Sequence, residues 1–281
     1  MRSGTPSRTA LAAASHRAAH QILEKGSIFS DPLAVRIIGL DAATIAREAE
    51  EQPSRRAMRM FIAVRTRFAE DALAAAVERG VTQLVILGAG LDTYAYRTKL
   101  GDRLRIFEVD HPATQEWKRQ RLEEAAIPIP STLTFAPIDF ERQTLSEGLA
   151  AARFDPPQQT FFTWLGVVPY LTAEAFWSTL NFVANLPNAA HLVFDYSNPP
   201  ESLTAEARAN YDMRAARVAE LGEAWLTHFE TEDLRAKLSQ LAFNEIEDLG
   251  PPQIAARYFP NSSKSFPEKG GHVLRATKGE T

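Results

Sequence analysis

The segment Val81–Thr93, which reads V-T-Q-L-V-I-L-G-A-G-L-D-T, constrains the fold of this chain more than any other stretch. Leu84–Leu87 is a continuous apolar run, typical of a strand that is buried on both faces. Gly88 and Gly90 follow at once, and glycines let the backbone turn sharply and approach a ligand closely. We expect a helix to begin at Leu91, which makes the segment the first crossover of a doubly wound α/β sheet. Ligands bind such sheets at the carboxyl ends of the strands.

Acidic side chains end a second predicted strand, Leu104–Val109. Glu108 lies about twenty residues after Gly88, the distance at which an acid reaches the diol of a ribose. Asp110 follows two residues later. The pattern predicts a ligand that contains adenosine.

The glycine loop also separates two classes of cofactor. A dinucleotide fold favours G-x-G-x-x-G, and the third glycine position here is Thr93. Asp92 stands where its charge would repel a pyrophosphate. S-adenosylmethionine (SAM) has no phosphate and carries a sulfonium and an ammonium, so it suits an acid near the loop. The loop and the acids favour SAM over NAD, while the alternative remains that a short glycine turn is a plain packing device.

Composition narrows the class of protein. The 281 residues are 45% hydrophobic and 23% charged, typical of a globular chain, and fit one large α/β domain with additions or two small ones. The net charge of -4 offers no electrostatic footprint for nucleic acid. The chain has no cysteine, which excludes disulfides, thiolate zinc sites and a cysteine nucleophile. No apolar run approaches the ~18 residues that span a bilayer, and the N-terminus lacks the apolar core of a signal peptide. We therefore expect a cytoplasmic protein without a nucleic-acid or membrane partner; the oligomeric state is not indicated.

The N-terminal region is predicted to be helical. Thr9–Leu23 is rich in alanine, which favours a helix. His16 and His20 would share one face of it. No third ligand accompanies them, so we expect two partly solvated imidazoles rather than a metal site or a catalytic base. Ser30-Asp31-Pro32 predicts the start of a second helix.

A long helix is predicted from Ser54 to about Arg79, and Arg65 falls among its apolar positions. Such an arginine either extends its charged end to solvent or binds an anion such as a carboxylate. The residues alone leave both interpretations open.

A third strand, Thr132–Ala136, is predicted after a helix at Pro112–Glu124, and Asp139 and Phe140 follow that strand. An acid at this place can meet the amino group of an adenine. The alternative is that Asp139 caps a helix from Glu141 onward.

A fourth strand, Thr160–Leu165, is predicted to border the first. Trp164, Leu165 and Tyr170 are therefore candidates for the lining of a ligand pocket, although large aromatic residues more often pack in a core. The remaining predicted segments are the helix Ala173–Asn185, the strand His191–Phe194, an insertion at Ser197–Glu230 with the charged helix Glu201–Glu220, the helix Asp233–Gln240, and the strands Ala242–Leu249 and His272–Ala276 joined by the connection Pro251–Pro267.

Taken together, L-G-A-G-L-D-T with a following Y-R, F-E-V-D-H-P, P-I-D-F and W-L-G-V-V-P-Y-L-T resemble the leucine carboxyl methyltransferase family. This family of class I SAM-dependent O-methyltransferases includes protein-phosphatase carboxyl methyltransferases, called here the phosphatase-type members, and tetracenomycin-type polyketide methyltransferases. The resemblance extends from about Ser7 to about Phe194. It implies an α/β fold with a Rossmann-like, seven-stranded sheet whose final strand is antiparallel. Residues 1–281 would form a single methyltransferase domain, with an N-terminal helical cap at 1–54 and a lid insertion at 197–230.

The resemblance also implies roles for particular residues. Leu165 stands where the phosphatase-type members carry a glutamate, which favours the small-molecule branch of the family. The expected cofactor-binding residues are Arg65, Gly88, Gly90, Glu108, Asp110, Asp139, Phe140 and Leu165. Arg65 would bind the carboxylate of SAM, and the two glycines would lie under its methionine part. Asp110, with Glu108 as its neighbour, corresponds to the acid that binds SAM after the second strand, and Asp139 and Phe140 would lie beside the adenine.

The expected reaction is a direct displacement at the methyl group of SAM, transferring it to a carboxyl or hydroxyl oxygen of a small, partly apolar, polyketide-like molecule. It needs no metal. A carboxylate acceptor needs no base, whereas a phenol or alcohol would benefit from one. The alternatives are a protein C-terminal carboxyl methyltransferase, an NAD(P)-dependent oxidoreductase, and a SAM-binding protein without catalysis. The candidates for a base are His111 and Tyr170, with Tyr94 and Asp195 as further candidates.

Overall fold

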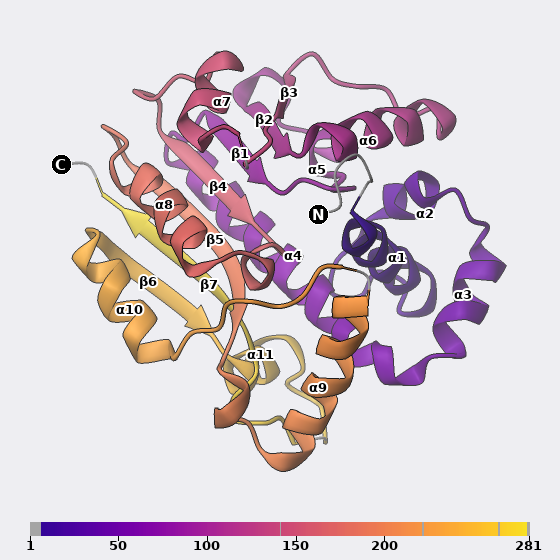
Figure 1. Cartoon of the computed structure of the whole chain (residues 1–281). Coiled ribbons are helices and arrows are strands. Elements are labelled where there is room, and N and C mark those ends of the chain that lie inside the picture. The colour runs from indigo at the N-terminus through magenta and orange to yellow at the C-terminus, as the bar shows by residue number, and fades with distance from the viewer. Residues whose placement is uncertain (1–6, 141, 221, 264, 280–281) are drawn as a thin grey trace. The chain divides into compact units, whose positions relative to one another are not determined.

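A mixed, seven-stranded sheet forms the core of the described residues (Figure 1). Its strands are β1 (Gln83–Leu87), β2 (Arg105–Asp110), β3 (Leu133–Pro137), β4 (Thr160–Trp164), β5 (Ala190–Ser197), β6 (Phe243–Leu249) and β7 (Gly271–Lys278). Their order in the sheet is β3-β2-β1-β4-β5-β7-β6. The pairs β2–β3 and β4–β5 are parallel, and β7 runs antiparallel to both β5 and β6. The predicted seven-stranded α/β sheet with an antiparallel final strand is confirmed.

The structure is a computed structural model, and it describes residues 7–140, 142–220, 222–263 and 265–279. The chain divides into two compact units. The first comprises Met1–Asp71 and Leu84–Phe154, and the second comprises Ala72–Gln83 and Asp155–Thr281.

The first unit contains β1 to β3 and most of the helices of the N-terminal half. Figure 1 shows its first three helices side by side, in indigo and purple. Ala14, Ala18, Ile37, Ile45 and Leu122 form a buried cluster that packs these helices together and against the helix after β2. The helices are α1 (Arg8–Leu23), α2 (Pro32–Ile38), α3 (Ala42–Glu50), most of α4 (Arg56–Glu78), α5 (Tyr94–Arg97), α6 (Pro112–Glu124) and α7 (Leu145–Ala151), with the 3-10 turns η1 (Pro53–Arg55) and η2 (Gly101–Arg103).

Side-chain caps explain where the first three helices begin. Ser7, Asp31 and Asp41 stand just before α1, α2 and α3, and each side-chain oxygen accepts a hydrogen bond from the backbone N–H three residues later. Such caps satisfy amides that have no partner within the helix. The predicted starts at Thr9 and Pro32 are therefore correct to within one residue, whereas α3 was not predicted.

The predicted helix at Leu91 is wrong. Residues 91–93 form a loop, and α5 after it is a single turn that begins at Tyr94. The Asp92 carboxylate accepts a hydrogen bond from the Tyr94 amide at 2.7 Å. A short acidic side chain that bonds to the nearby backbone competes with helix formation in this way.

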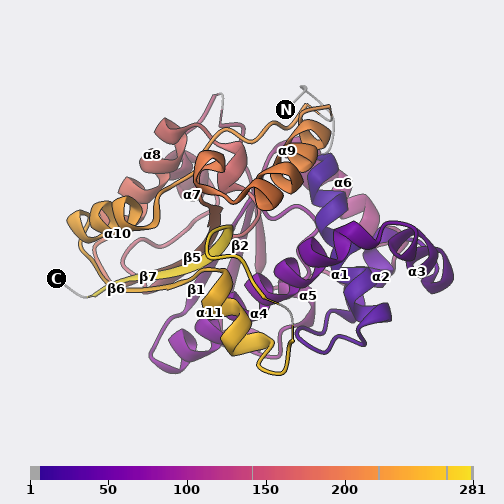
Figure 2. The same ribbon diagram turned by 90° about the horizontal axis from the view of Figure 1, so that it is seen from below.

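The second unit surrounds β4 to β7. Buried aromatic side chains form its core, among them Phe161, Phe162, Phe176 and Phe194. Figures 1 and 2 show that α8 (Ala173–Ala184) and α10 (Thr231–Gln240) lie on the same face of these strands. The other helical segments are α9 (Ala205–Glu220), α11 (Pro251–Tyr258), η3 (Val168–Tyr170) and η4 (Pro200–Ser202).

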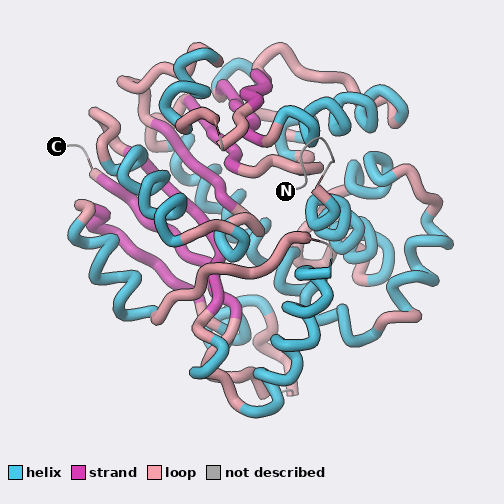
Figure 3. The backbone as a smooth tube through the Cα atoms, viewed as in Figure 1, coloured by secondary structure: helices cyan, strands magenta, loops and turns pink. Residues whose placement is uncertain are grey.

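The predicted connection Pro251–Pro267 between the last two strands contains helix α11 in its first eight residues. Two prolines stand in the first turn of this helix, where they need no amide partner. Figure 3 shows the insertion at 197–230 as helix α9 followed by a loop that leads to α10. No residue of α9 is buried within the described structure. None of the described helices is both long and apolar enough to cross a membrane.

Candidate functional site

The glycine loop after β1 is fastened to the end of the neighbouring strand β2. The Gly90 amide donates to Asp110 Oδ2 at 2.6 Å, and the Ala89 amide donates to the carbonyl of Val109 at 3.0 Å. Gly88 and Gly90 have φ values of +65° and +45°, a backbone region that favours glycine. The sequence-predicted glycines and Asp110 therefore do lie together, at the carboxyl ends of adjacent strands.

Helix α1 packs directly on this loop. A Cβ added to Gly90 would lie 2.9 Å from the Cβ of Ala10, closer than such atoms approach one another. Arg17, two turns further along α1, donates from Nη2 to the carbonyl of Leu91 at 2.6 Å. Only glycine therefore fits between α1 and the turn.

Asp110 holds two backbone amides at once. Besides Gly90, its Oδ1 accepts from the His111 amide at 2.7 Å. Burial raises the pKa of this carboxyl group, and the hydrogen bonds from the two amides oppose that rise. A carboxylate has about four lone-pair sites, so two amide bonds leave capacity for a hydroxyl ligand.

Glu108 has a partner that the sequence did not predict. Its carboxylate is completely buried and lies 2.7 Å from Nζ of Lys118, a buried residue of α6. The Tyr96 hydroxyl donates to Glu108 Oε2 at 3.3 Å. Burial raises the pKa of Glu108 to about 7, against the opposing effect of Lys118. Glu108 therefore forms an ion pair within the chain, two residues before Asp110. Its Oε1 has no hydrogen-bond partner among the described residues.

The other predicted residues of the first unit differ in exposure. Arg65, on α4, is only 8% exposed, so its charged end does not extend into solvent. Phe140 is 57% exposed, and the neighbouring Asp139 lies 3.5 Å from Nε of Arg142. The alternative role of Asp139 as a helix cap is wrong, because α7 begins later and Thr144 caps it.

Leu165 and Tyr170 belong to the second unit, where both are half-buried. Leu165 follows β4, and the next amide, that of Gly166, donates to Asp195 Oδ1 at 2.5 Å. Gly166 has a φ of +73°. An aspartate on β5 thus holds the glycine turn after β4, as Asp110 on β2 holds the turn after β1.

The candidate bases His111, Tyr94 and Asp195 make hydrogen bonds within the chain. His111 caps α6, and its Nδ1 accepts from the Ala113 amide at 3.2 Å. The Tyr94 hydroxyl accepts from Thr98 Oγ1 at 3.3 Å, and burial raises the pKa of this tyrosine. Asp195 accepts from Gly166 as described. Each of the three thus has one polar atom engaged within the chain, which leaves all three as candidates for a general base.

Sequence reasoning missed several charged residues around the loop, namely Arg17, Asp31, Glu70, Arg97 and Lys118. Helical spacing held a signal for one of them, since Ala10, Ala14 and Arg17 fall on a single face of α1. His20 was also misjudged as partly solvated. It is 1% exposed, and its Nε2 accepts from the amides of Ile28 and Phe29 at 3.4 and 3.5 Å.

The comparisons with known proteins agree with the motifs. A sequence model of the leucine carboxyl methyltransferase family matches residues 10–184. Among curated relatives, YktD of Bacillus subtilis, provisionally named an S-adenosyl-L-methionine-dependent methyltransferase, is 36% identical over 65% of this chain and 60% of its own length. A similarly named protein of Mycobacterium avium is 32% identical over 79% of this chain and 76% of its own length. The chain spans about 60% of the length of the first two curated relatives that it matches.

Solved structures share the fold at low sequence identity. A DUF574 family protein of Streptomyces avermitilis superposes with a TM-score of 0.53 at 14% identity, over 94% of this chain and 97% of its own. A protein of Bordetella parapertussis described as a possible exported protein gives a TM-score of 0.50 at 12% identity, over 96% of each chain. The family model covers more than half of the sequence, and this chain therefore belongs to the leucine carboxyl methyltransferase family.

Proposed function

We propose that this protein is a SAM-dependent O-methyltransferase whose cofactor binds at the carboxyl ends of β1 and β2. One observation carries the proposal: Asp110 at the end of β2 holds the amide of Gly90 in the glycine turn after β1. This arrangement combines an acid for a ribose diol with a turn that a ligand can approach closely. Membership of a methyltransferase family supports the same activity.

The chemistry of the donor set suits SAM. Gly88 and Gly90 would lie under the methionine part, with the buried guanidinium of Arg65 on its carboxylate. Asp110 would accept from the ribose hydroxyls, and the exposed ring of Phe140, with Asp139, would contact the adenine. When bound, the cofactor would supply an activated methyl group on a positively charged sulfur. The acidic side chains suit that charge and would disfavour a pyrophosphate.

The acceptor is proposed to be a small, partly apolar molecule with a carboxyl or hydroxyl group. Leu165 supports this, because it replaces the glutamate of phosphatase-type members of the family. The aromatic and apolar segment Trp164–Tyr170 suits a ring-bearing ligand. The protein would hold the acceptor oxygen in line with the methyl group at ~3 Å, which accounts for much of the rate in such displacements. A carboxylate acceptor would need no base.

Residues 1–281 are proposed to act as one methyltransferase domain, with the cap at 1–54 and a lid at 197–230 that closes over the acceptor. A protein C-terminal carboxyl group is the second candidate acceptor, and the family's description supports it. An NAD(P)-dependent oxidoreductase is disfavoured, because Thr93 fills the position of the third glycine. A SAM-binding protein without catalysis would keep the Asp110 arrangement and close the acceptor site. A cytoplasmic location stays a prediction from the sequence.

Calorimetry with SAM, S-adenosylhomocysteine (SAH) and NADH tests the cofactor. Binding of SAM and SAH without NADH is expected, and binding of NADH alone would overturn the proposal. Transfer of labelled methyl groups from SAM, assayed in parallel on aromatic acids and phenols and on proteins of a cell extract, tests the acceptor. Label in small molecules is expected. Label confined to protein bands would instead identify a protein carboxyl methyltransferase.

A further inference from the structure

A single buried carboxylate joins the N-terminal helices to the glycine loop. Asp31, between α1 and α2, is 1% exposed. Its Oδ2 accepts from Arg17 Nε at 2.9 Å and from Thr93 Oγ1 at 2.8 Å. Its Oδ1 accepts from the Ala34 amide at 3.0 Å, which caps α2. Asp31 therefore binds α1, α2 and the loop after β1 at the same time.

Thr93 makes the connection on the side of the loop. It directly precedes α5 but does not cap that helix. Instead its hydroxyl donates to Asp31 and accepts from Arg97 Nε at 3.1 Å. The two bonds fix the direction of the hydroxyl. Thr93, which stands in the third glycine position, therefore joins Asp31 to Arg97.

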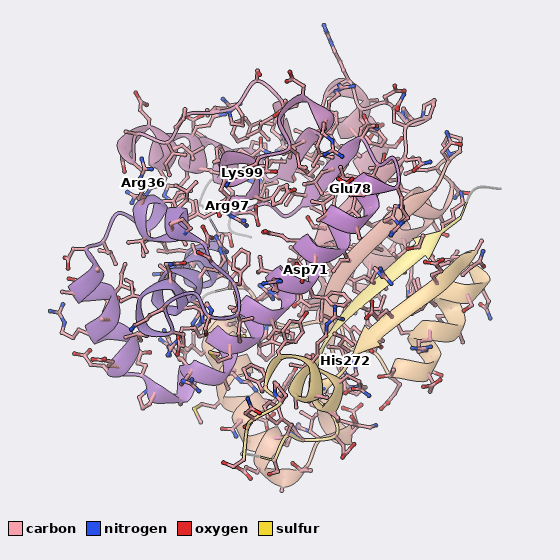
Figure 4. The ribbon with its side chains drawn as sticks, turned by 180° about the vertical axis from the view of Figure 1, so that it is seen from behind. Arg36, Asp71, Glu78, Arg97, Lys99 and His272 are labelled. Atoms are coloured by element: carbon pink, nitrogen blue, oxygen red, sulfur yellow. The ribbon has the colours of Figure 1, made fainter. Side chains whose placement is uncertain are left out.

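Charges around Asp31 balance within the cluster. Arg17 and Arg97 face its carboxylate, with Arg97 Nε 3.8 Å from Oδ1. Arg97, labelled in Figure 4, extends from α5 and also makes a two-pronged ion pair with Glu70 of α4. Arg17 also donates to the carbonyl of Leu91, so it binds both Asp31 and the loop. Because the cluster is buried, loss of one member leaves other charges without a partner, which is costly.

We propose that Asp31 is a positioning residue for cofactor binding: through Thr93 and Arg17 it fixes the loop at residues 90–93 in the form that receives SAM. The inference rests on the proposed function, because it takes that loop as part of the cofactor site. It adds a coupling between the N-terminal helices and the cofactor. By linkage, a ligand that prefers the ordered loop also orders the helices that hold it.

The capping role of Asp31 can be separated from this positioning role. Serine caps helices about as well as aspartate, but it cannot hold two arginines. Asp31→Ser therefore keeps a cap for α2 and removes the ionic junction. Asp41→Ser is the matched control, since Asp41 caps α3 in the same way, by accepting from the Thr44 amide at 2.9 Å, and is exposed.

SAH binding to the full chain, measured by calorimetry, is the first readout. Asp31→Ser is expected to weaken SAH binding about tenfold or more, because Asp31 contacts the loop through Thr93. Asp41→Ser is expected to weaken it less than about twofold, as is typical of a site that shares no contacts with the loop. Thr93→Val removes the junction while leaving both arginines on Asp31, and should also weaken binding. Because the two side chains act through one bond, the double variant Asp31→Ser/Thr93→Val should lose less than the product of the single losses.

Amide hydrogen exchange is the second readout, and it needs no ligand. Exchange at residues 90–93 should be faster in Asp31→Ser and Thr93→Val than in the wild type or Asp41→Ser, with the strand amides of β1 unchanged. In the wild type, SAH should slow exchange in α1 and α2.

The outcomes separate the two proposals. Wild-type SAH affinity and wild-type loop exchange in folded Asp31→Ser would overturn the positioning role, and should that variant not fold, the same results in Thr93→Val would do so. Failure of the wild type to bind SAM or SAH would instead overturn the proposed function. Loop exchange in the variants would then still decide whether Asp31 orders the loop.

Discussion

At the scale of single residues, the first unit uses acids in two different ways at the end of one strand. Asp110 binds backbone amides and keeps unused lone pairs, whereas Glu108, two residues earlier, is completely buried and paired with Lys118. The strand period of two places both side chains on one face of β2. The acid at the last position of the strand keeps acceptor capacity, whereas the deeper acid is paired within the protein.

Asp110→Asn tests the outer acid. The amide has a single acceptor oxygen, so it cannot hold both the Gly90 and His111 amides and also accept from a ribose. SAH affinity measured by calorimetry should fall at least about tenfold, as for a lost hydrogen bond to a charged group. Asp102→Asn, at an exposed position of η2, is the control and should bind like the wild type. Equal affinities in both folded variants would remove Asp110 from the cofactor site.

Lys118→Met tests the inner acid. It leaves the buried Glu108 carboxylate without its cation, and breaking such a pair typically costs about 3–5 kcal/mol. Urea unfolding at pH 8 should show a loss of this order. The double variant Lys118→Met/Glu108→Gln should recover part of it, because an uncharged amide is cheaper to bury than a carboxylate. A Lys118→Met protein as stable as the wild type would contradict the pairing.

At the scale of elements, local patterns in the sequence predicted most strands and helices, because each predicted element carries its own signal. The run Leu84–Leu87 is apolar on both faces, and Asp31-Pro32 is a helix start in itself. The features that the sequence did not predict depend on contacts between distant segments. Gly88 and Gly90 were assigned to a ligand loop, but the packing of Ala10 on Gly90 and the bond from Arg17 to Leu91 appear only in the folded chain.

Gly90→Ala tests how α1 packs on the loop. The substitution combines a strained φ of +45° with a clash against Ala10. A destabilisation of roughly 1–3 kcal/mol and weaker SAH binding are expected. Gly101→Ala is a matched control, since Gly101 has a φ of +53° and nothing within 4 Å of the added Cβ. It should show the backbone strain alone. Ala10→Gly should restore part of the unfolding free energy that Gly90→Ala loses, but none of the loss caused by Gly101→Ala. If Ala10→Gly changed the stability of both variants equally, the contact between Ala10 and the added Cβ at position 90 would be excluded.

At the scale of the whole molecule, both units fix a glycine turn in the same way. In the first, an aspartate of β2 holds the turn after β1, and in the second an aspartate of β5 holds the turn after β4. Gly90, Asp110 and Asp195 were candidate site residues from the sequence, but Gly166 was not, and the pairing of each glycine with its acid needs the order of the strands. The class of fold was therefore predictable from the sequence, whereas the hydrogen bonds that shape its turns were not.

Buried titratable groups of the two units should respond to pH in opposite directions. Burial lowers the pKa of His191, on β5, from 6.5 to about 4. The unfolded chain then binds the proton more tightly than the folded one, so the contribution of His191 to stability is complete above pH 6.5 and is lost as the pH falls towards 4. Burial raises the pKa of Glu108 from 4.5 to about 7, so that its contribution is complete below pH 4.5 and is lost as the pH rises towards 7.

These opposite slopes overlap, so the wild-type profile alone cannot reveal either group, and a substitution is needed to separate them. His191→Gln removes only the acid-sensitive component. The free energy of unfolding of the wild type minus that of His191→Gln, from urea titrations, should increase between pH 4 and 6.5 by the order of 2 kcal/mol and then level off. The difference at pH 8 measures the packing of the ring, since the imidazole is neutral in both states there, and serves as the internal reference. A difference that stays constant from pH 4 to 8 would mean that His191 is as free to take up a proton in the folded chain as in the unfolded one, contrary to its burial on β5.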